Sequence, residues 1–188
     1  MKIELFLSRD GQSPFEDWFE GLDTQAAAKV ATAVTRMGQG NMSEAKGVGG
    51  GLLEYRIHYG PGYRVYFGKD GDKIIILVGG GTKRRQSKDI DAAKARWREY
   101  KQRKKEALFQ EAISLLLDGD VETGKAVIRD YINATIGFED LALKVGTSAP
   151  SLMRMFSAKG NPTAKKLFPV IKRLQKETGI EVGLTVSG

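Results

Sequence analysis

Residues 52–83 read LLEYRIHYGPGYRVYFGKDGDKIIILVGGGTK and contain the strongest strand pattern of the chain. Two runs of alternating side chains flank a turn at residues 60–62, which predicts an antiparallel β-hairpin. A tight turn at Asp70 and Gly71 leads into residues 73–78, which are apolar on both faces of a strand. The spacing therefore predicts a small antiparallel sheet with residues 73–78 as its central strand.

The hairpin has two unlike faces, because side chains two residues apart lie on the same side of a strand. One face is aromatic and aliphatic, and its residues are Tyr55, Ile57, Tyr59, Tyr63, Val65 and Phe67. The other face carries Glu54, Arg56, His58, Arg64 and Tyr66. We expect the first face to be a core wall and the second to be a basic surface.

Composition excludes several classes of site. The 188 residues are 41% hydrophobic, with no cysteine and one histidine. These counts exclude a disulfide framework, a thiolate metal site and a histidine-rich metal centre, and we expect no cofactor. The first residues are too polar for a signal peptide, and no apolar run is long enough for a membrane span. We therefore expect a soluble, cytoplasmic protein with no membrane partner.

The positive charge lies in the first part of the chain. Residues 1–105 hold 20 lysines and arginines against 13 acids, whereas residues 106–188 hold 10 of each. A basic surface favours polyanions without specifying which one. The asymmetry indicates two units with different partners.

The first half predicts an α+β domain. Residues 2–7 alternate like a short strand, and Ser13 and Pro14 begin a short helix that runs to about Glu20. Asp23 caps a second helix ending near Gly38, so that the two form a helical hairpin. The glycine-rich residues 47–51 lack the lysine and hydroxyl of a phosphate-binding loop, and we interpret them as a flexible connector.

The rest of the chain predicts helices only. A helix over residues 89–105 is followed by a change of composition at Glu106. Glycines and cap residues then delimit further helices over residues 107–117, 121–134, 138–145, 150–156 and 163–176. Residues 180–186 alternate and could add a small strand or pair with a second copy of the chain.

The basic face has the side chains that RNA cleavage needs. Attack by a 2′-hydroxyl requires cations at the phosphate, a proton acceptor and a proton donor. Arg56, Arg64 and Lys83 can supply the cations, and Tyr66, His58 or a lysine could move protons. Alternatively, such a surface carries arginine and tyrosine without any function.

Three segments in this half together resemble those of a known family. The segment YRIHYGPGYRVYF, followed by GGGTK and DIDAAKARW, resembles the HigB-like branch of the RelE/ParE toxin superfamily across residues 1–103. The resemblance implies a ribosome-dependent mRNA endonuclease, with Arg64 as a phosphate ligand and Arg56 and Lys83 or Arg84 at the other basic positions. The tyrosine that follows the second basic cluster in RelE is replaced here by residues 89–91, so the proton-transfer role passes to another residue.

The second half contains a helix-turn-helix pattern. Its small core is formed by residues with the required order and spacing, namely Leu141, Ala142, Val145, Gly146, Leu152 and Met155. The second helix would present Ser148, Ser151 and Arg154 to the major groove of DNA. A helix pair used only for packing is the alternative.

Residues from about Lys105 to Val182 resemble the HigA-like antitoxins of the Xre helix-turn-helix class, through SLMRMFSAKGNPT and the preceding helices. The resemblance implies a DNA-binding autorepressor that blocks its toxin. We therefore predict a fused toxin and antitoxin: an α+β RelE-like toxin domain over residues 1–103 and an all-α helix-turn-helix antitoxin domain over residues 104–188. Expected partners are mRNA on the ribosome, operator DNA, a toxin–antitoxin contact within or between chains, and a second copy of the chain. Two other readings are a transcriptional regulator whose inert toxin fold serves as a binding or assembly module, and an artificial joining of two genes.

Overall fold

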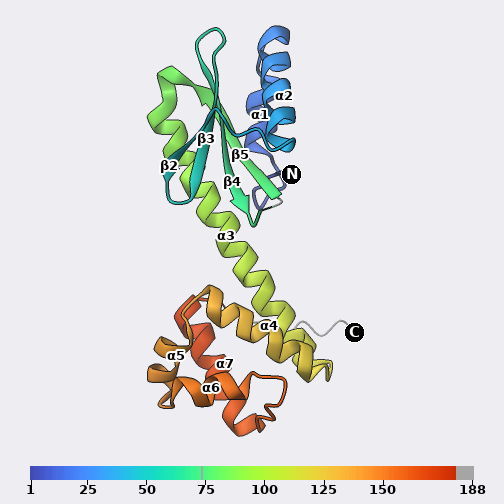
Figure 1. Ribbon diagram of the computed structural model, residues 1–188, viewed down its shortest axis with the longest axis vertical. Helices are drawn as coiled ribbons and strands as arrows, with labels where there is room; N and C mark the ends of the chain where they lie inside the picture. Colours follow the sequence, from blue (N-terminus) through green and yellow to red (C-terminus); the bar gives the residue numbers. More distant parts are fainter. Residues whose placement is uncertain (73, 181–188) are drawn as a thin grey trace. The chain divides into compact units, whose positions relative to one another are not determined.

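A computed structural model describes residues 1–72 and 74–180 of the chain (Figure 1). Within these residues the chain is α+β, with a five-stranded mixed sheet and seven α-helices. It divides into two compact units, the first covering Met1–Lys101 and the second beginning at Gln102. None of the helices in the described ranges combines the length and the apolar character needed to cross a membrane.

The first unit is built on the sheet, whose strand order is β1-β5-β4-β3-β2. The strands are β1 (Lys2–Leu5), β2 (Ala45–Gly49), β3 (Leu52–Ile57), β4 (Tyr63–Asp70) and β5 (Ile74–Thr82). The hairpin prediction is confirmed, because β3 and β4 pair antiparallel with Tyr55 opposite Val65 and Arg56 opposite Arg64. The sheet is mixed rather than antiparallel, because β1 pairs parallel to β5.

Two expectations about strands were wrong. The glycine-rich residues 47–51 do not form a connector, because β2 pairs antiparallel with β3 and the chain turns at residues 50 and 51. The hydrogen bonds offered by β3 outweigh the poor strand propensity of glycine. The strand β5 is buried on both faces as expected, but the middle of the sheet is β4, because β1 adds to the far side of β5.

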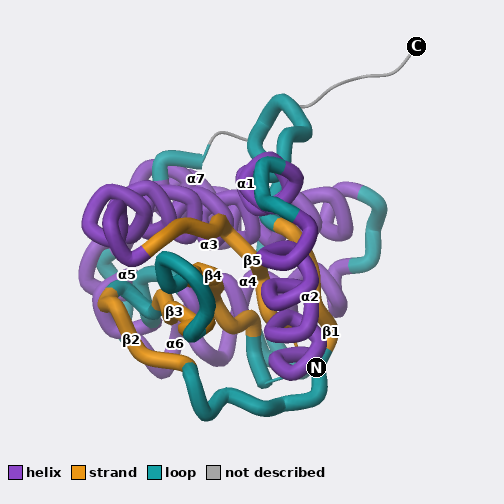
Figure 2. The backbone as a smooth tube through the Cα atoms, turned by 90° about the horizontal axis from the view of Figure 1, so that it is seen from above, coloured by secondary structure: helices purple, strands orange, loops and turns teal. Residues whose placement is uncertain are grey.

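Helices cover both faces of this sheet (Figure 2). Helices α1 (Pro14–Glu20) and α2 (Thr24–Gly38) pack on the face that carries Tyr55, Val65 and Phe67. Both predicted caps are present, since Ser13 Oγ accepts from the Glu16 amide at 3.3 Å and Asp23 Oδ1 from the Ala26 amide at 2.9 Å. The apolar face of the hairpin is therefore the core wall that its pattern predicts.

Helix α3 (Gln86–Leu117) covers the opposite face with Ala93 and Trp97. Glycines on the strands make room for large side chains on both sides. A β-carbon on Gly80 would lie 1.9 Å from the Trp18 ring of α1, and one on Gly68 would lie 2.5 Å from the Trp97 ring. The two tryptophans can therefore lie flat against the backbone of β5 and β4 only because these positions are glycine.

The predicted break near Glu106 is absent, because α3 continues through it to Leu117. Residues 101–107 contain no glycine or proline and consist mainly of lysine, arginine, glutamine, glutamate and alanine, all of which favour helix. The change of composition thus marks a change of packing partner without ending the helix. The boundary between the two units lies inside this one helix.

The second unit is helical. Besides the end of α3, it contains α4 (Val121–Ala134), α5 (Phe138–Val145), α6 (Ala149–Met155) and α7 (Ala164–Thr178). Its core is formed by buried residues from all five helices, including Phe109, Tyr131, Leu141, Leu152 and Leu174. The predicted bounds of α4 and α5 are confirmed to the residue, and the expected strand at residues 180–186 lies almost entirely outside the described residues.

Candidate functional site

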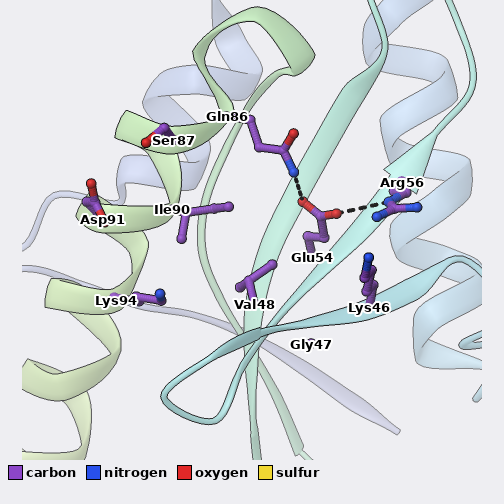
Figure 3. A pocket seen from close by; sticks show the side chains of 10 residues that line it. All are labelled: Lys46, Gly47, Val48, Glu54, Arg56, Gln86, Ser87, Ile90, Asp91 and Lys94. Carbon is purple, nitrogen blue, oxygen red and sulfur yellow. Dashed lines mark hydrogen bonds and ion pairs between the residues drawn. The ribbon is translucent and has the colours of Figure 1, made fainter.

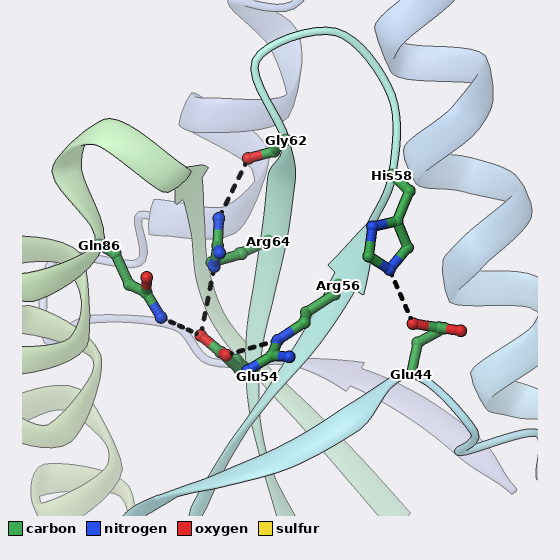
Figure 4. A network of polar contacts seen from close by, with 7 residues as sticks. All are labelled: Glu44, Glu54, Arg56, His58, Gly62, Arg64 and Gln86. Carbon is green, nitrogen blue, oxygen red and sulfur yellow. Dashed lines mark hydrogen bonds and ion pairs between the residues drawn. The ribbon is translucent and has the colours of Figure 1, made fainter.

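The carboxylate of Glu54, on β3, is the centre of a polar cluster on the sheet of the first unit (Figure 4). Its Oε1 accepts from Arg56 Nε at 2.9 Å, and its Oε2 accepts from Gln86 Nε2 at 2.8 Å. Arg64 Nε forms an ion pair with Oε2 at 3.4 Å. Glu54 is 1% exposed, so a buried carboxylate positions two guanidinium groups and one side-chain amide.

A third cation, Lys83, is held beside Arg64 by the turn of the hairpin. The carbonyl of Gly62 accepts from Arg64 Nη1 at 3.3 Å and from the backbone amide of Lys83 at 2.9 Å. Lys83 begins the short 3-10 helix Lys83–Arg85 that joins β5 to α3. Arg56, Arg64 and Lys83 consequently line one surface cavity of about 360 Å³, together with His58 and Gln86.

His58 lies at the edge of this cavity and points toward Glu44 (Figure 4). Its side chain is 76% exposed, and its Nε2 is 3.0 Å from Glu44 Oε2. If Nε2–H donates to the carboxylate, Nδ1 keeps its lone pair and can accept a proton. This geometry fits the expectation that His58 is available for proton transfer.

Tyr66 does not belong to this surface, contrary to expectation. It is 1% exposed and packs between the sheet and α3 with Ile76 and Trp97. Burial raises the pKa of its hydroxyl, and the negative charges of Asp89 and Glu54 raise it further. The prediction failed for a tertiary reason. The alternation of the hairpin shows that Tyr66 faces away from the core of α1 and α2, but it does not show that α3 covers this second face.

Arg84 is also separated from the other predicted cations. It lines a different hollow, with Arg85, Lys88 and Asp89, on the 3-10 helix and the first turn of α3. Of the two predicted alternatives, Lys83 and Arg84, the structure brings Lys83 next to Arg56 and Arg64.

Asp89 lies where the resemblance placed a departure from the family pattern. Its carboxylate packs against Gly81, where a β-carbon would lie 2.0 Å from Oδ2. Burial raises the pKa of this carboxyl group, while Arg85 and Arg96 oppose the shift. Asp89 therefore packs against the end of β5, and it does not line the cavity of Arg64.

Sequence reasoning missed Glu54 and Gln86 as members of the cluster. A signal for Glu54 was present, because it is the one acid on a strand face that otherwise carries Arg56, Arg64 and His58. The apolar stripe of Ile90, Ala93 and Trp97 was a signal for Gln86. An apolar stripe on a helix requires a surface to cover, and the helix that carries this stripe also carries Gln86.

In the second unit, the predicted DNA-contacting residues share one side of α6. The Ser148 hydroxyl caps this helix by accepting from the Ser151 amide at 3.4 Å, and Arg154 is exposed one turn further on. Leu152 of the same helix is fully buried. Gly146 adopts the left-handed conformation, with φ of 70°, in the turn between α5 and α6.

The loop after α6 is tied to α4 by a buried lysine. Lys125 is 1% exposed, and its Nζ donates to the Gly160 carbonyl at 2.5 Å and to Glu122 Oε1 at 2.7 Å. These bonds satisfy a charge that would otherwise be costly to bury. Across residues 1–72 and 74–180, no three histidines, aspartates or glutamates lie close enough together to hold a metal ion.

Comparison with known proteins identifies a similar protein. No family model matches the chain. A protein of Haemophilus influenzae named "Uncharacterized protein" is 40% identical to it over 81 residues, which are 43% of this chain and 82% of that protein. The name of that protein states no activity. The chain belongs to the same family as this uncharacterized Haemophilus influenzae protein.

Proposed function

We propose that the first unit binds and cleaves RNA, as the ribosome-dependent HigB-like toxins that it resembles do. One observation carries the proposal: Arg56, Arg64 and Lys83, from three separate segments, line one cavity. Guanidinium groups bind phosphate with directed hydrogen bonds, and a lysine beside them adds a mobile charge. The Glu54 carboxylate and the Gly62 carbonyl hold both guanidiniums in place before any ligand arrives.

The chemistry follows from the same residues. His58 Nδ1 would take the proton of the ribose 2′-hydroxyl, and the oxygen would attack phosphorus to form a 2′,3′-cyclic phosphate. The bond from phosphorus to the 5′-oxygen would break, and that oxygen would leave with a proton from water or from Lys83. Arg56 and Arg64 would stabilise the charge that develops on the phosphate oxygens.

The fragment 1–103 provides the test, because the two cores of the first unit use no residue beyond Tyr100. Its expression should arrest growth, and Arg64→Ala should relieve the arrest. Arg64 is nearly buried, so Lys83→Ala, at an exposed position, serves as a second variant that is not expected to disturb folding. Arg98→Ala, at an exposed position of α3, removes the same charge outside the cavity and should leave the arrest intact. Normal growth with a soluble, folded fragment would contradict the proposal.

We further propose that the second unit binds operator DNA through α6. The supporting observation is that Ser148, Ser151 and Arg154 recur at three-residue spacing along a capped helix that is anchored in the core by the buried Leu152. Arginine is the usual reader of guanine, and serines take phosphate oxygens. A gel shift on the promoter of the protein's own gene should weaken with Arg154→Ala and remain with Arg129→Ala, an exposed arginine of α4. A shift insensitive to Arg154→Ala would count against base readout by this helix.

The second candidate function is a transcriptional regulator whose first unit is an inert binding module. A specific observation favours it: Glu54 already neutralises one of the two guanidinium charges, through a hydrogen bond from Arg56 Nε and an ion pair with Arg64 Nε. An inert unit predicts a folded 1–103 fragment that binds RNA weakly and does not arrest growth. The growth assay therefore separates the two candidates.

A further inference from the structure

A second hollow of about 500 Å³ lies beside the proposed phosphate site, between β2 and the first turns of α3 (Figure 3). The two hollows share Arg56 and Gln86 as lining residues. Its volume falls in the range of roughly 300–1,000 Å³ that small-ligand sites occupy. The two hollows are therefore neighbours that meet at Arg56.

The floor of this hollow is apolar. Val48 from β2 and Ile90 from α3 project into the space between the two elements (Figure 3), and both are half-buried against the core that contains Tyr66 and Trp97. Such a surface gains nothing from an inorganic anion. It suits a flat ring, whose apolar faces lose contact with water when they pack on it.

The rim of the hollow is polar and of mixed charge. Lys46 on β2 and Lys94 on α3 face it, with Lys94 Nζ lying over the turn at Gly49. Gln86 gives its amide hydrogen to Glu54 and keeps its carbonyl oxygen as an acceptor, and Asp91 adds a carboxylate. An acid at the rim disfavours a second phosphate, whereas acceptors and donors together match the edge of a base.

We propose that this hollow is a nucleoside subsite, which takes the base and ribose of the nucleotide whose phosphate is bound at Arg56. The inference rests on the proposed RNA-binding function and assigns Val48, Ile90 and Lys94 a place in it. Val48 and Ile90 contact the base, Lys94 lies beside the ribose, and Arg56 joins the subsite to the phosphate site. The ligand is one nucleoside monophosphate unit of a single-stranded RNA.

The test compares two probes on the full chain by calorimetric titration: inorganic phosphate and the four ribonucleoside 5′-monophosphates. At least one nucleotide should bind about tenfold tighter than phosphate, since the base adds contacts that phosphate lacks. Equal affinities, or no nucleotide binding at millimolar concentration, would overturn the subsite.

Two variants locate the added affinity. Val48→Thr keeps the shape of the side chain but places a hydroxyl on the floor, and Lys94→Ala removes one charge from the rim. Each variant should weaken nucleotide binding several-fold and leave phosphate binding unchanged. Arg98→Ala, on the same helix as Lys94 but outside the hollow, should change neither affinity. Circular dichroism of each variant checks that the fold is retained, and unchanged nucleotide affinity in both folded variants would overturn the inference.

Arg64→Ala distinguishes this failure from failure of the phosphate site. It should weaken phosphate and nucleotide by the same factor, because it removes a contact common to both. If Arg64→Ala weakens both probes while Val48→Thr and Lys94→Ala do nothing, only the nucleoside subsite is wrong. If Arg64→Ala changes neither probe, the proposed phosphate site itself is wrong.

Discussion

Glu54 binds three side chains that come from different parts of the first unit, and its replacement tests the whole cluster. Glu54→Gln keeps the volume but removes the charge that Arg56 and Arg64 share. A buried charge network that loses one member is destabilised, and partial exposure of Arg56, at 37%, moderates the loss. We expect the free energy of unfolding to fall by about 2 kcal/mol in denaturant titrations.

Glu44→Gln is the matched control for this substitution. Glu44 is an exposed partner of His58, and exposed pairs contribute little to stability. Its loss should change the free energy of unfolding by less than about 0.5 kcal/mol. Equal effects of the two substitutions would show that the Glu54 cluster is not a stabilising network.

One buried tyrosine, Tyr66, and one half-buried tyrosine, Tyr100, predict a loss of stability at high pH. Burial raises the pKa of Tyr66, and burial together with a 2.7 Å hydrogen bond to Asp70 raises the pKa of Tyr100. The unfolded chain releases these protons near pH 10, while the folded chain retains them. Stability is therefore complete below about pH 10 and falls above it, by up to about 1.4 kcal/mol per pH unit for each group.

Tyr66→Phe isolates one of these groups. The variant should show a shallower decline than the wild type when unfolding is measured between about pH 9 and about pH 11. Its hydroxyl has no hydrogen-bond partner among the described residues, so its removal should cost little at neutral pH. An unchanged alkaline slope would mean that Tyr66 ionises in the folded protein as easily as in the unfolded chain.

At the scale of elements, β5 depends on a glycine that no other residue can replace. Gly80→Ala would place a methyl group 1.9 Å from the Trp18 ring, and neither the strand nor the helix can move without disturbing the core. We expect a loss of at least about 2 kcal/mol in the free energy of unfolding. Gly47→Ala is the matched control, because a β-carbon there meets no atom within 4 Å and should be nearly neutral in the same measurement.

The elements that could be predicted are those whose signals are local. The caps at Ser13 and Asp23, the period of two in β3 and β4, and the glycine between α5 and α6 each specify their own neighbourhood. The strand β2 could not be predicted, because its hydrogen bonds come from β3 and its own residues are mostly glycine. The continuity of α3 could not be predicted from composition, because the change of charge at Glu106 does not end the helix.

The same distinction explains the candidate site. The cations Arg56, Arg64 and Lys83 could be predicted from the alternation of the hairpin and from the position that follows β5. The burial of Tyr66 and the roles of Glu54 and Gln86 depend on where α3 packs, which is a tertiary property. A single sequence shows the stripe on α3 without showing which strand face it covers.

For the whole molecule, the proposed toxin and antitoxin lie in one chain, so we expect the ribonuclease activity proposed for the first unit to be silenced independently of protein concentration. A tethered partner acts at an effective concentration of about a millimolar or more when the geometry permits contact. The full chain should therefore show lower ribonuclease activity per molecule than the fragment 1–103, and the difference should persist over about a hundredfold dilution. Activity that rises on dilution would indicate silencing between chains, and equal activities would contradict silencing altogether.

The close packing against Gly68, Gly80 and Gly81 also has a genetic consequence. A single base change at the first or second position of a glycine codon yields a codon for a residue with a β-carbon, or a stop. Nearly every such change at codons 68, 80 and 81 would force a side chain into Trp97, Trp18 or Asp89. If cells are selected for escape from the activity of the first unit, inactivating mutations should accumulate at these three codons, although none of them encodes a proposed phosphate ligand.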